Sequence, residues 1–111
     1  MKNEYLESLL EMVNEQKERV PTGTLKILRA YYDGTRNGNF ELDIEDGFFE
    51  SELNDALQTL EAAGINNFRL YDNSSGLMAT IYYLLKAGFQ VETVEKVSRW
   101  GDKRYGLRFY K

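Results

Sequence analysis

Two short segments with the same chemistry constrain the fold of this chain more than any other feature. Ala63-Gly64-Ile65 and Ala87-Gly88-Phe89 each follow an amphipathic stretch and precede a short apolar one. Glycine just after a helix allows the left-handed conformation that ends it, and the next hydrophobe packs back on the last turn. Each segment therefore predicts a helix that ends abruptly and leads into a strand, which is typical of folds that combine the two.

The spacing of apolar residues predicts helices near residues 3–18, 50–63 and 75–87. A further helix is expected to begin at Thr22 or Thr24 and to stop at Gly34 in a left-handed conformation. The polar turn 72–76 offers oxygens that could cap the helix 75–87. The side chains expected to be buried in the last two helices are Leu53, Leu57, Leu60, Ile81, Leu84 and Leu85.

Strict alternation of apolar and acidic residues over 40–45 predicts a strand whose face with Glu41, Asp43 and Glu45 is wet. A short strand follows over 67–71, and residues 90–111 form a hairpin. Gly101-Asp102 suits a type II′ turn, which would place Val94 opposite Phe109 and Glu95 opposite Arg108.

These elements predict an α/β (α+β) fold over residues 1–111, a length suited to one domain. Two N-terminal helices, within 1–34, precede a βαβαββ unit over 39–111. We expect a sheet of about four strands with a C-terminal antiparallel hairpin and helices packed on the sheet. The order of the first three strands stays open.

Composition excludes several kinds of chemistry. The chain has no cysteine and no histidine, which removes zinc sites built from these residues, disulfides, thiol catalysis and imidazole acid-base catalysis. It also lacks the apolar stretch of a signal peptide or a membrane span, so a cytoplasmic protein with no membrane partner is expected. We predict a protein that is not an enzyme and that binds no cofactor and no metal.

The net charge of −4 hides a division of the chain. Residues 96–111 carry six bases against the single acid Asp102, a net +5, which leaves −9 for the remainder. From Glu41 to Glu61 the chain has no lysine or arginine. Such asymmetry bears on partners and on association rates rather than on fold.

Other sites fit the residues less well. The segment from Asn73-Ser74-Ser75-Gly76 to Ala87-Gly88-Phe89, with the hairpin, resembles the last third of a GCN5-type acetyltransferase, but the cofactor's Gly-rich loop would fall in the acidic stretch 43–52. An acetyltransferase-like remnant is therefore a second alternative to a binding function. The turn 72–76 is better explained by helix capping than by an anion-binding nest. The acidic run lacks the ligand spacing of a calcium loop, and so short a chain leaves little room for the cleft of a glycoside hydrolase.

A second resemblance covers the C-terminal half, about residues 50–98. Leu60-Glu61-Ala62-Ala63-Gly64-Ile65, Phe68-Arg69-Leu70, Ser75-Gly76-Leu77 and Ala87-Gly88-Phe89 resemble small uncharacterised proteins of phages and other mobile genetic elements. That resemblance implies an accessory protein in the host bacterial cytoplasm that acts on a host or element-encoded partner. One function of such proteins is to inhibit host defence, and anti-CRISPR activity is an example. The resemblance assigns no functional residue.

Two binding hypotheses follow. In the first, an acidic surface docks on a basic protein partner that handles nucleic acid; its residues are Glu41, Asp43, Glu45, Asp46, Glu50, Glu52 and Asp55. In the alternative, the hairpin binds nucleic acid, with bases neutralising phosphates and aromatics stacking on nucleobases; its residues are Arg99, Trp100, Lys103, Arg104 and Arg108, with Tyr105 or Tyr110. The oligomeric state stays open, and self-association through the first helix is a third hypothesis.

Overall fold

The structure is a computed structural model that describes residues 3–15, 19–36, 38, 41–72 and 74–111. Its elements are α1 (Glu4–Asn14), α2 (Thr22–Arg36), β1 (Leu42–Ile44), α3 (Glu50–Ala62), β2 (Asn67–Leu70), α4 (Leu77–Lys86), β3 (Gln90–Val97) and β4 (Lys103–Tyr110). The strands form one mixed sheet in the order β1-β2-β4-β3, with β1 and β2 parallel and the other pairs antiparallel. The predicted α+β class and the C-terminal antiparallel hairpin are therefore confirmed. Phe40, Asn73 and residues 16–18, which were assigned above to a strand, a turn and a helix end, lie outside the described residues.

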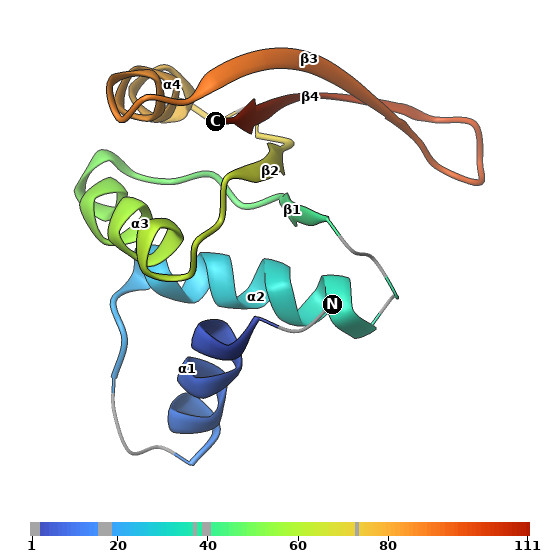
Figure 1. Ribbon diagram of the computed structural model, residues 1–111. Helices are drawn as coiled ribbons and strands as arrows, with labels where there is room; N and C mark the ends of the chain where they lie inside the picture. The colour runs from blue at the N-terminus through green and yellow to red at the C-terminus, as the bar shows by residue number, and fades with distance from the viewer. Residues whose placement is uncertain (1–2, 16–18, 37, 39–40, 73) are drawn as a thin grey trace.

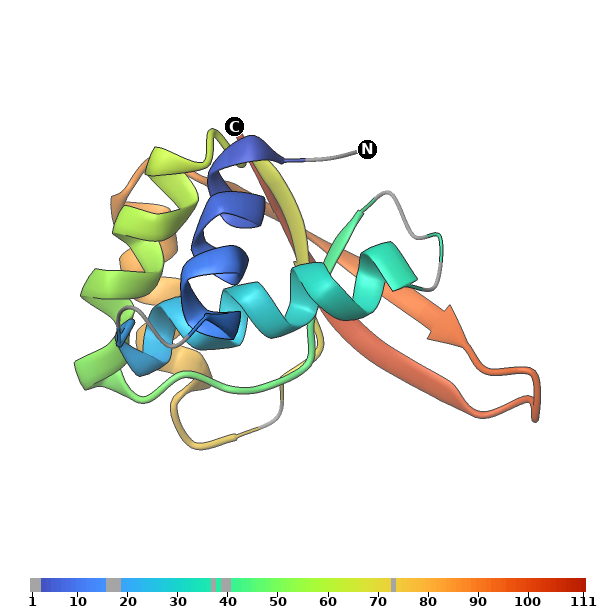
Figure 2. The ribbon, with the colours of Figure 1, turned by 90° about the horizontal axis from the view of Figure 1, so that it is seen from below.

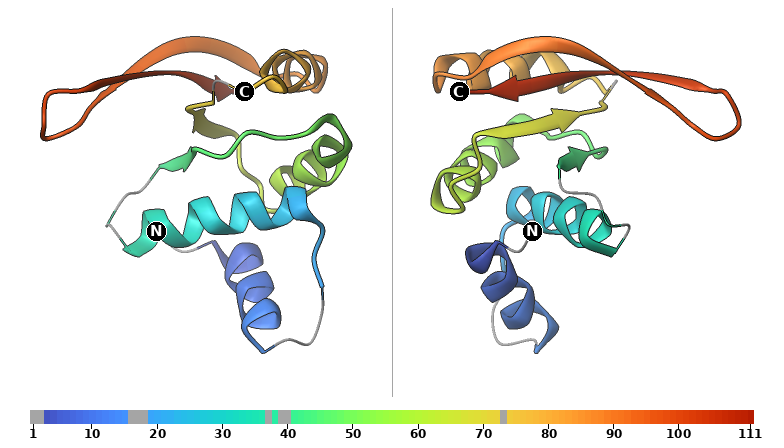
Figure 3. Two further views of the ribbon diagram at one scale, coloured as in Figure 1. Left: turned by 180° about the vertical axis from the view of Figure 1, so that it is seen from behind. Right: turned by 45° about the vertical axis from the view of Figure 1, so that its right-hand side comes forward.

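α4 lies level with the hairpin, and α3, α2 and α1 follow in that order away from it (Figures 1 and 3). α3 and α4 lie beside the sheet, α2 packs against β1 and α3, and α1 lies beyond α2. Asn3 ties α1 to this stack, because its side-chain amide donates to the Ala63 carbonyl at 2.9 Å and its oxygen accepts from the Leu6 N–H at 3.0 Å. The N-terminal helices therefore support the β1 edge of the sheet.

The hydrophobic core lies between one face of the sheet and the helices. Its centre is aromatic: the Phe68 ring stacks on Phe109 at 5.5 Å between centroids and meets Phe89 edge-on at 5.6 Å. The hydrophobic side chains with the least exposure are Leu6, Ile27, Leu28, Ile44, Phe68, Leu70 and Phe109. They come from α1, α2 and three strands, so the core joins both halves of the chain.

Both predicted helix exits are confirmed. Gly64 and Gly88 have positive φ angles of 68° and 101°. The Ile65 N–H donates to the Leu60 carbonyl at 2.9 Å, and the Phe89 N–H donates to the Leu84 carbonyl at 3.1 Å. These bonds satisfy carbonyls that a helix end leaves open, and they turn the chain toward β2 and β3.

Three predictions about the helices are wrong. α2 continues through Gly34 to Arg36, because a helix tolerates one glycine when its other residues pack, as they do here on β1 and α3. In the turn 72–76, the Asp72 carboxylate accepts from the Ser74 N–H at 2.7 Å, and the N-cap residue of α4 is Gly76, which has no side chain to cap the helix. Leu85 is 44% exposed, because α4 buries the stripe that contains its neighbour Leu84.

The predicted hairpin register is wrong by three residues. Val91, not Val94, lies opposite Phe109, and Glu92 lies opposite Arg108. The strands are joined by a three-residue loop: the Ser98 N–H donates to the Asp102 carbonyl at 2.9 Å, and the Gly101 N–H donates to the Ser98 carbonyl at 3.0 Å. Gly101, with φ of 86°, closes this loop as its last residue rather than opening a two-residue turn.

The hairpin extends past the rest of the sheet. β2 pairs with β4 only from Leu107 to Tyr110, so within the described residues the segment 94–106 has no third strand beside it. We call residues 94–106 the arm. Figure 2 shows the arm projecting from the body formed by the helices and the other strands.

Candidate functional site

The acidic residues of β1 are bound to bases of the chain. The Arg69 guanidinium donates to both carboxylate oxygens of Asp43, at 2.6 and 3.1 Å, and contacts Glu41 at 2.9 Å. The Asp43 side chain is only 10% exposed, so its predicted position on a wet face is wrong. Because β1 pairs with β2 in parallel, Asp43 and Arg69 are direct cross-strand partners, and the acid is covered by its own counterion.

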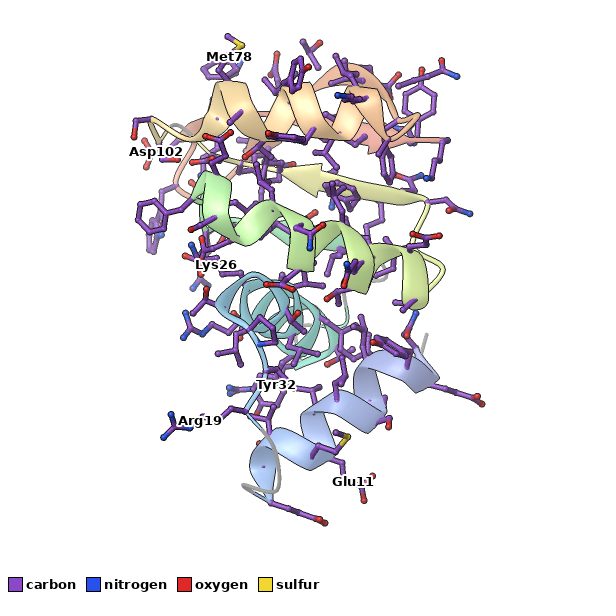
Figure 4. The ribbon with its side chains drawn as sticks, turned by 90° about the vertical axis from the view of Figure 1, so that its left-hand side faces the viewer. Glu11, Arg19, Lys26, Tyr32, Met78 and Asp102 are labelled. Atoms are coloured by element: carbon purple, nitrogen blue, oxygen red, sulfur yellow. The ribbon has the colours of Figure 1, made fainter. Side chains whose placement is uncertain are left out.

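Glu52 is likewise an internal residue and not part of an acidic surface. It is 7% exposed, forms an ion pair with Lys26 at 2.7 Å, and accepts from the Phe49 N–H at 2.8 Å at the start of α3. Burial acts to raise the pKa of Glu52, but hydrogen bonds from Lys26, the Phe49 N–H and Thr22 outweigh it and hold the pKa below its ordinary value. Figure 4 shows Lys26 on α2 at the level where that helix meets α3. Glu52 therefore helps to hold two helices together.

Three of the other acids proposed for the acidic surface, Glu45, Asp46 and Glu50, also have side-chain contacts within the chain. Glu45 binds Arg104 and lies 3.6 Å from the Lys96 ammonium, and Asp46 lies 3.7 Å from Arg29. Glu50 accepts from the Tyr83 hydroxyl at 3.2 Å, and Asp55 is half-buried in α3. The acidic run does not gather into one open surface, because bases from α2, β2 and the hairpin are interspersed among its carboxylates.

Tyr71 anchors the root of the arm. It is 4% exposed, and its ring packs on the backbone of Gly106, where a Cβ atom would lie only 2.5 Å from the ring. Lys96 and Arg104 place their cationic groups 5.4 and 5.6 Å from the centre of the same ring. These two bases then reach Glu45 on the body. The arm is thus fixed at its root by packing and by charge.

Most side chains in the outer part of the arm are exposed to solvent. The side chains of Trp100 and Tyr105 are 79% and 71% exposed, and Val97 is 59% exposed. Arg99 lies against the Trp100 ring, 5.4 Å from its centre, and Lys103 contacts Glu95 at 3.6 Å. A tryptophan, a tyrosine and two bases therefore lie at the end of a projecting hairpin.

The residues of the predicted basic hairpin fall into two groups. Arg99, Trp100 and Lys103 lie in its outer part, as that hypothesis requires. Arg104 and Arg108 turn back to carboxylates, Arg104 to Glu45 and Arg108 to Glu92 at 2.6 Å. Lys103 also contacts a carboxylate, that of Glu95 at 3.6 Å, so of these five residues Arg99 and Trp100 are the ones for which no contact with an acid is observed in the described part of the chain.

Two hollows accompany these groups. One, of about 260 Å³, lies between α2 and β1, and both signs of charge line it, among them Arg29, Asp33, Asp43 and Lys96. The other, of about 660 Å³, runs between α1 and α2 along Glu4, Glu7 and Glu11. Across the described residues, no three acidic side chains converge as metal ligands, and no helix is long and apolar enough to cross a membrane.

Sequence reasoning missed Lys26, Arg69 and Tyr71. Arg69 carried a signal, since it alternates with buried Phe68 and Leu70 and so had to face the other side of the sheet. Its partner was hidden, because the pairing of β1 with β2 joins residues 26 positions apart. Lys26 and Tyr71 had no local signal for their contacts.

The chain matches a domain of unknown function, DUF7698, over residues 26–108. This chain belongs to that family. The matched segment runs from α2 into β4 and includes Lys26, Arg69, Tyr71 and the whole arm, whereas α1 lies outside it. No curated protein and no solved structure matches the chain.

Proposed function

We propose that this chain is a non-enzymatic protein-binding protein whose contact surface is the outer end of the arm. The surface consists of Arg99, Trp100, Lys103 and Tyr105. The observation that carries the proposal is the exposure of Trp100 and Tyr105, 79% and 71%, on a hairpin whose root is held by Tyr71 and by ion pairs. Tryptophan, tyrosine and arginine dominate the energetics of protein interfaces, and a rigid support lowers the entropy lost on binding.

The arm also indicates the chemistry of the partner. Trp100 offers a flat apolar surface, and the positive Arg99 lies against it, whereas Lys103, on the facing strand, is paired with Glu95. Such a tip fits an apolar pocket with acidic groups at its rim. The acidic residues proposed from the sequence are a weaker candidate for the contact surface than the arm, because Asp43 and Glu52 are buried and paired within the chain.

The finer role rests on the resemblance to mobile-element proteins. An accessory protein of a phage or mobile element would use the arm on a host or element-encoded protein. Inhibition of a host nucleic-acid-handling or defence protein, as anti-CRISPR proteins do, is the form of this role that the resemblance suggests. The absence of cysteine and histidine from the sequence supports binding rather than catalysis.

The single tryptophan of the chain makes the proposal testable, because Trp100 is the chain's own source of tryptophan emission once the partner's emission has been subtracted. Proteins captured by the full chain from its native host would be purified and titrated against it. We expect a blue shift of the emission on binding and a loss of at least about tenfold in affinity for the Tyr105→Ala and Arg99→Ala variants. Met78→Ala is the matched control, because Met78 is 75% exposed and projects from α4 (Figure 4). Unchanged affinity in both arm variants would overturn the proposal.

A second candidate is single-stranded nucleic acid. Arg99 against the Trp100 ring, with Lys103 at the start of β4 after the same loop, is an arrangement that can hold a base and its phosphate. Titration with a labelled single-stranded oligonucleotide separates the two. Quenching of Trp100 fluorescence that weakens steeply as salt rises, and is lost in Arg99→Ala, would favour nucleic acid and contradict the proposed protein partner.

A further inference from the structure

The two edges of the sheet are unequal. The β1 edge is three residues long and has α2 packed against it. The β3 edge is eight residues long, pairs only with β4 among the described residues, and is exposed at every position except Val94. It contains no proline, and its pairing with β4 is continuous, so no bulge twists it away. A long, regular, uncovered edge is a template for pairing with another strand.

The hairpin hydrogen bonds determine which β3 residues can pair outward. The Ser98 N–H donates to the Asp102 carbonyl, and bonding alternates along an antiparallel pair. The backbone N–H and C=O groups that point toward β4 are therefore those of Glu92, Val94 and Lys96. The residues whose backbone groups point outward are Val91, Thr93, Glu95 and Val97.

A second copy of the same strand fits this edge in one register. When the two strands align antiparallel with Val94 opposite Val94, the residues whose backbone groups point outward lie opposite one another. Val91 then pairs with Val97, and Thr93 pairs with Glu95. On the other face this alignment places Glu92 opposite Lys96, whose side chains remain 48% and 45% exposed alongside their contacts with Arg108 and Glu45 of the same copy. Neighbouring registers that keep the same bonding lose this match, because one places Glu95 opposite Glu95 and the other places Val91 opposite Glu95.

We infer that β3 is a homodimer interface, in which two copies pair their β3 edges antiparallel about Val94. The two four-stranded sheets then form one continuous sheet of eight strands. Val91 and Val97, which are 37% and 59% exposed in one copy, cover each other in the pair. The interface does not depend on the proposed function. The turn of each arm extends past Gln90 of the partner, and the two Trp100 side chains lie at opposite ends of the paired strands.

The absence of cysteine from the chain allows a direct test by crosslinking. In the proposed register, residue 94 faces its own copy in a non-hydrogen-bonded pair, where Cα atoms lie about 4.5 Å apart, within disulfide range. Val94→Cys should therefore form a disulfide-linked dimer under mild oxidation. Val97→Cys is the control, because the two copies of residue 97 lie six residues apart along the strand, about 20 Å. Crosslinking of Val97→Cys as fast as Val94→Cys, or none in either, would overturn the inference.

The mass in solution provides a second, independent measurement. The unmodified chain should have twice the mass of its 12.9 kDa protomer in light scattering at about 100 μM, in the range where weak homodimers form. Thr93→Pro should give a monomer, because it removes an outward N–H and leaves the bonds to β4 intact. Circular dichroism checks that this variant is folded. If it is not folded, the crosslinking of Val94→Cys and Val97→Cys tests the interface instead. A monomeric unmodified chain at that concentration would overturn the inference.

Discussion

The root and the arm of the hairpin are built from the same two strands but lie in different surroundings. Phe109 and Tyr105 lie on the same face of β4, four residues apart, yet Phe109 is 0% exposed and Tyr105 is 71% exposed. Phe109 has β2 beside it and Phe68 stacked on it, whereas Tyr105, among the residues that the structure describes, has one neighbouring strand, β3, where it pairs with Glu95. Neighbours from distant parts of the chain, not residue type, decide which aromatic side chain belongs to the core.

The charged residues show the same contrast. In the body, the Lys26–Glu52 and Arg69–Asp43 pairs have exposed fractions between 8% and 27% and several hydrogen bonds. In the arm, both side chains of the Lys103–Glu95 pair are 55% exposed. Water screens the outer pair and lets its side chains move, so pairs of equal formal charge should differ in their contribution to stability.

The largest difference is expected between the two aromatics. Phe109→Ala should lower the free energy of unfolding by about 3 to 5 kcal/mol, because it leaves a cavity beside Phe68. Tyr105→Ala should change it by less than about 0.5 kcal/mol. Urea unfolding followed by circular dichroism measures both. Equal losses would mean that the arm packs on something in solution.

The Lys26–Glu52 pair should have the next largest effect. Glu52→Gln should cost about 2 to 4 kcal/mol at neutral pH, because it leaves Lys26 largely buried without its counterion. The pKa of Glu52 is lower in the folded protein, so its contribution to stability is complete above the unfolded value of 4.5 and is lost as pH falls through the folded value. The difference in the free energy of unfolding between the unmodified chain and Glu52→Gln should therefore become smaller from pH 6 to pH 3, as measured by urea unfolding. The control is Glu50→Gln, which changes an exposed acid near Glu52. Its free energy of unfolding should differ little from that of the unmodified chain at any pH.

A smaller effect is expected for the Asp43–Arg69 pair at the sheet. Asp43→Asn should cost about 1 to 2 kcal/mol, because Arg69 loses a charged partner but keeps Glu41. Thermal unfolding monitored by circular dichroism measures the loss. A stability equal to that of the unmodified chain would mean that Glu41 alone satisfies Arg69.

The smallest effect should come from the arm. Glu95→Gln removes the exposed partner of Lys103 and should change the free energy of unfolding by less than about 0.5 kcal/mol. Urea unfolding at low and at high salt measures this. A loss as large as that of Asp43→Asn would contradict the contrast between arm and body.

Much of the local structure could be predicted because its causes are local. The helix exits at Gly64 and Gly88 depend on residues within one turn, and their hydrogen bonds follow from those residues. The hairpin register could not be predicted in this way, because Gly101 suits both a two-residue turn and the last position of a three-residue loop. The Ser98 hydroxyl, which accepts from the N–H groups of Trp100 and Asp102, contributes to the longer loop.

The candidate site was predicted only in part. The sequence placed Arg99, Trp100 and Lys103 near a turn, where the structure has them. It placed Asp43 in water, because alternation of apolar and acidic residues tells which residues share a face and not what covers that face. Glu52 was assigned to a surface, and its partner Lys26 lies on a helix 26 residues earlier in the chain.

By itself, the sequence determined the kinds of elements, their order, two helix ends and a division of charge, because these follow from backbone preferences, periodicity and composition. The tertiary structure decided the strand order β1-β2-β4-β3, the burial of Asp43 and Glu52, and the exposure of Tyr105 and of the β3 edge. Each of these depends on which distant segments meet. That outcome is set by the fit of whole surfaces in the core, and no short stretch of residues encodes it.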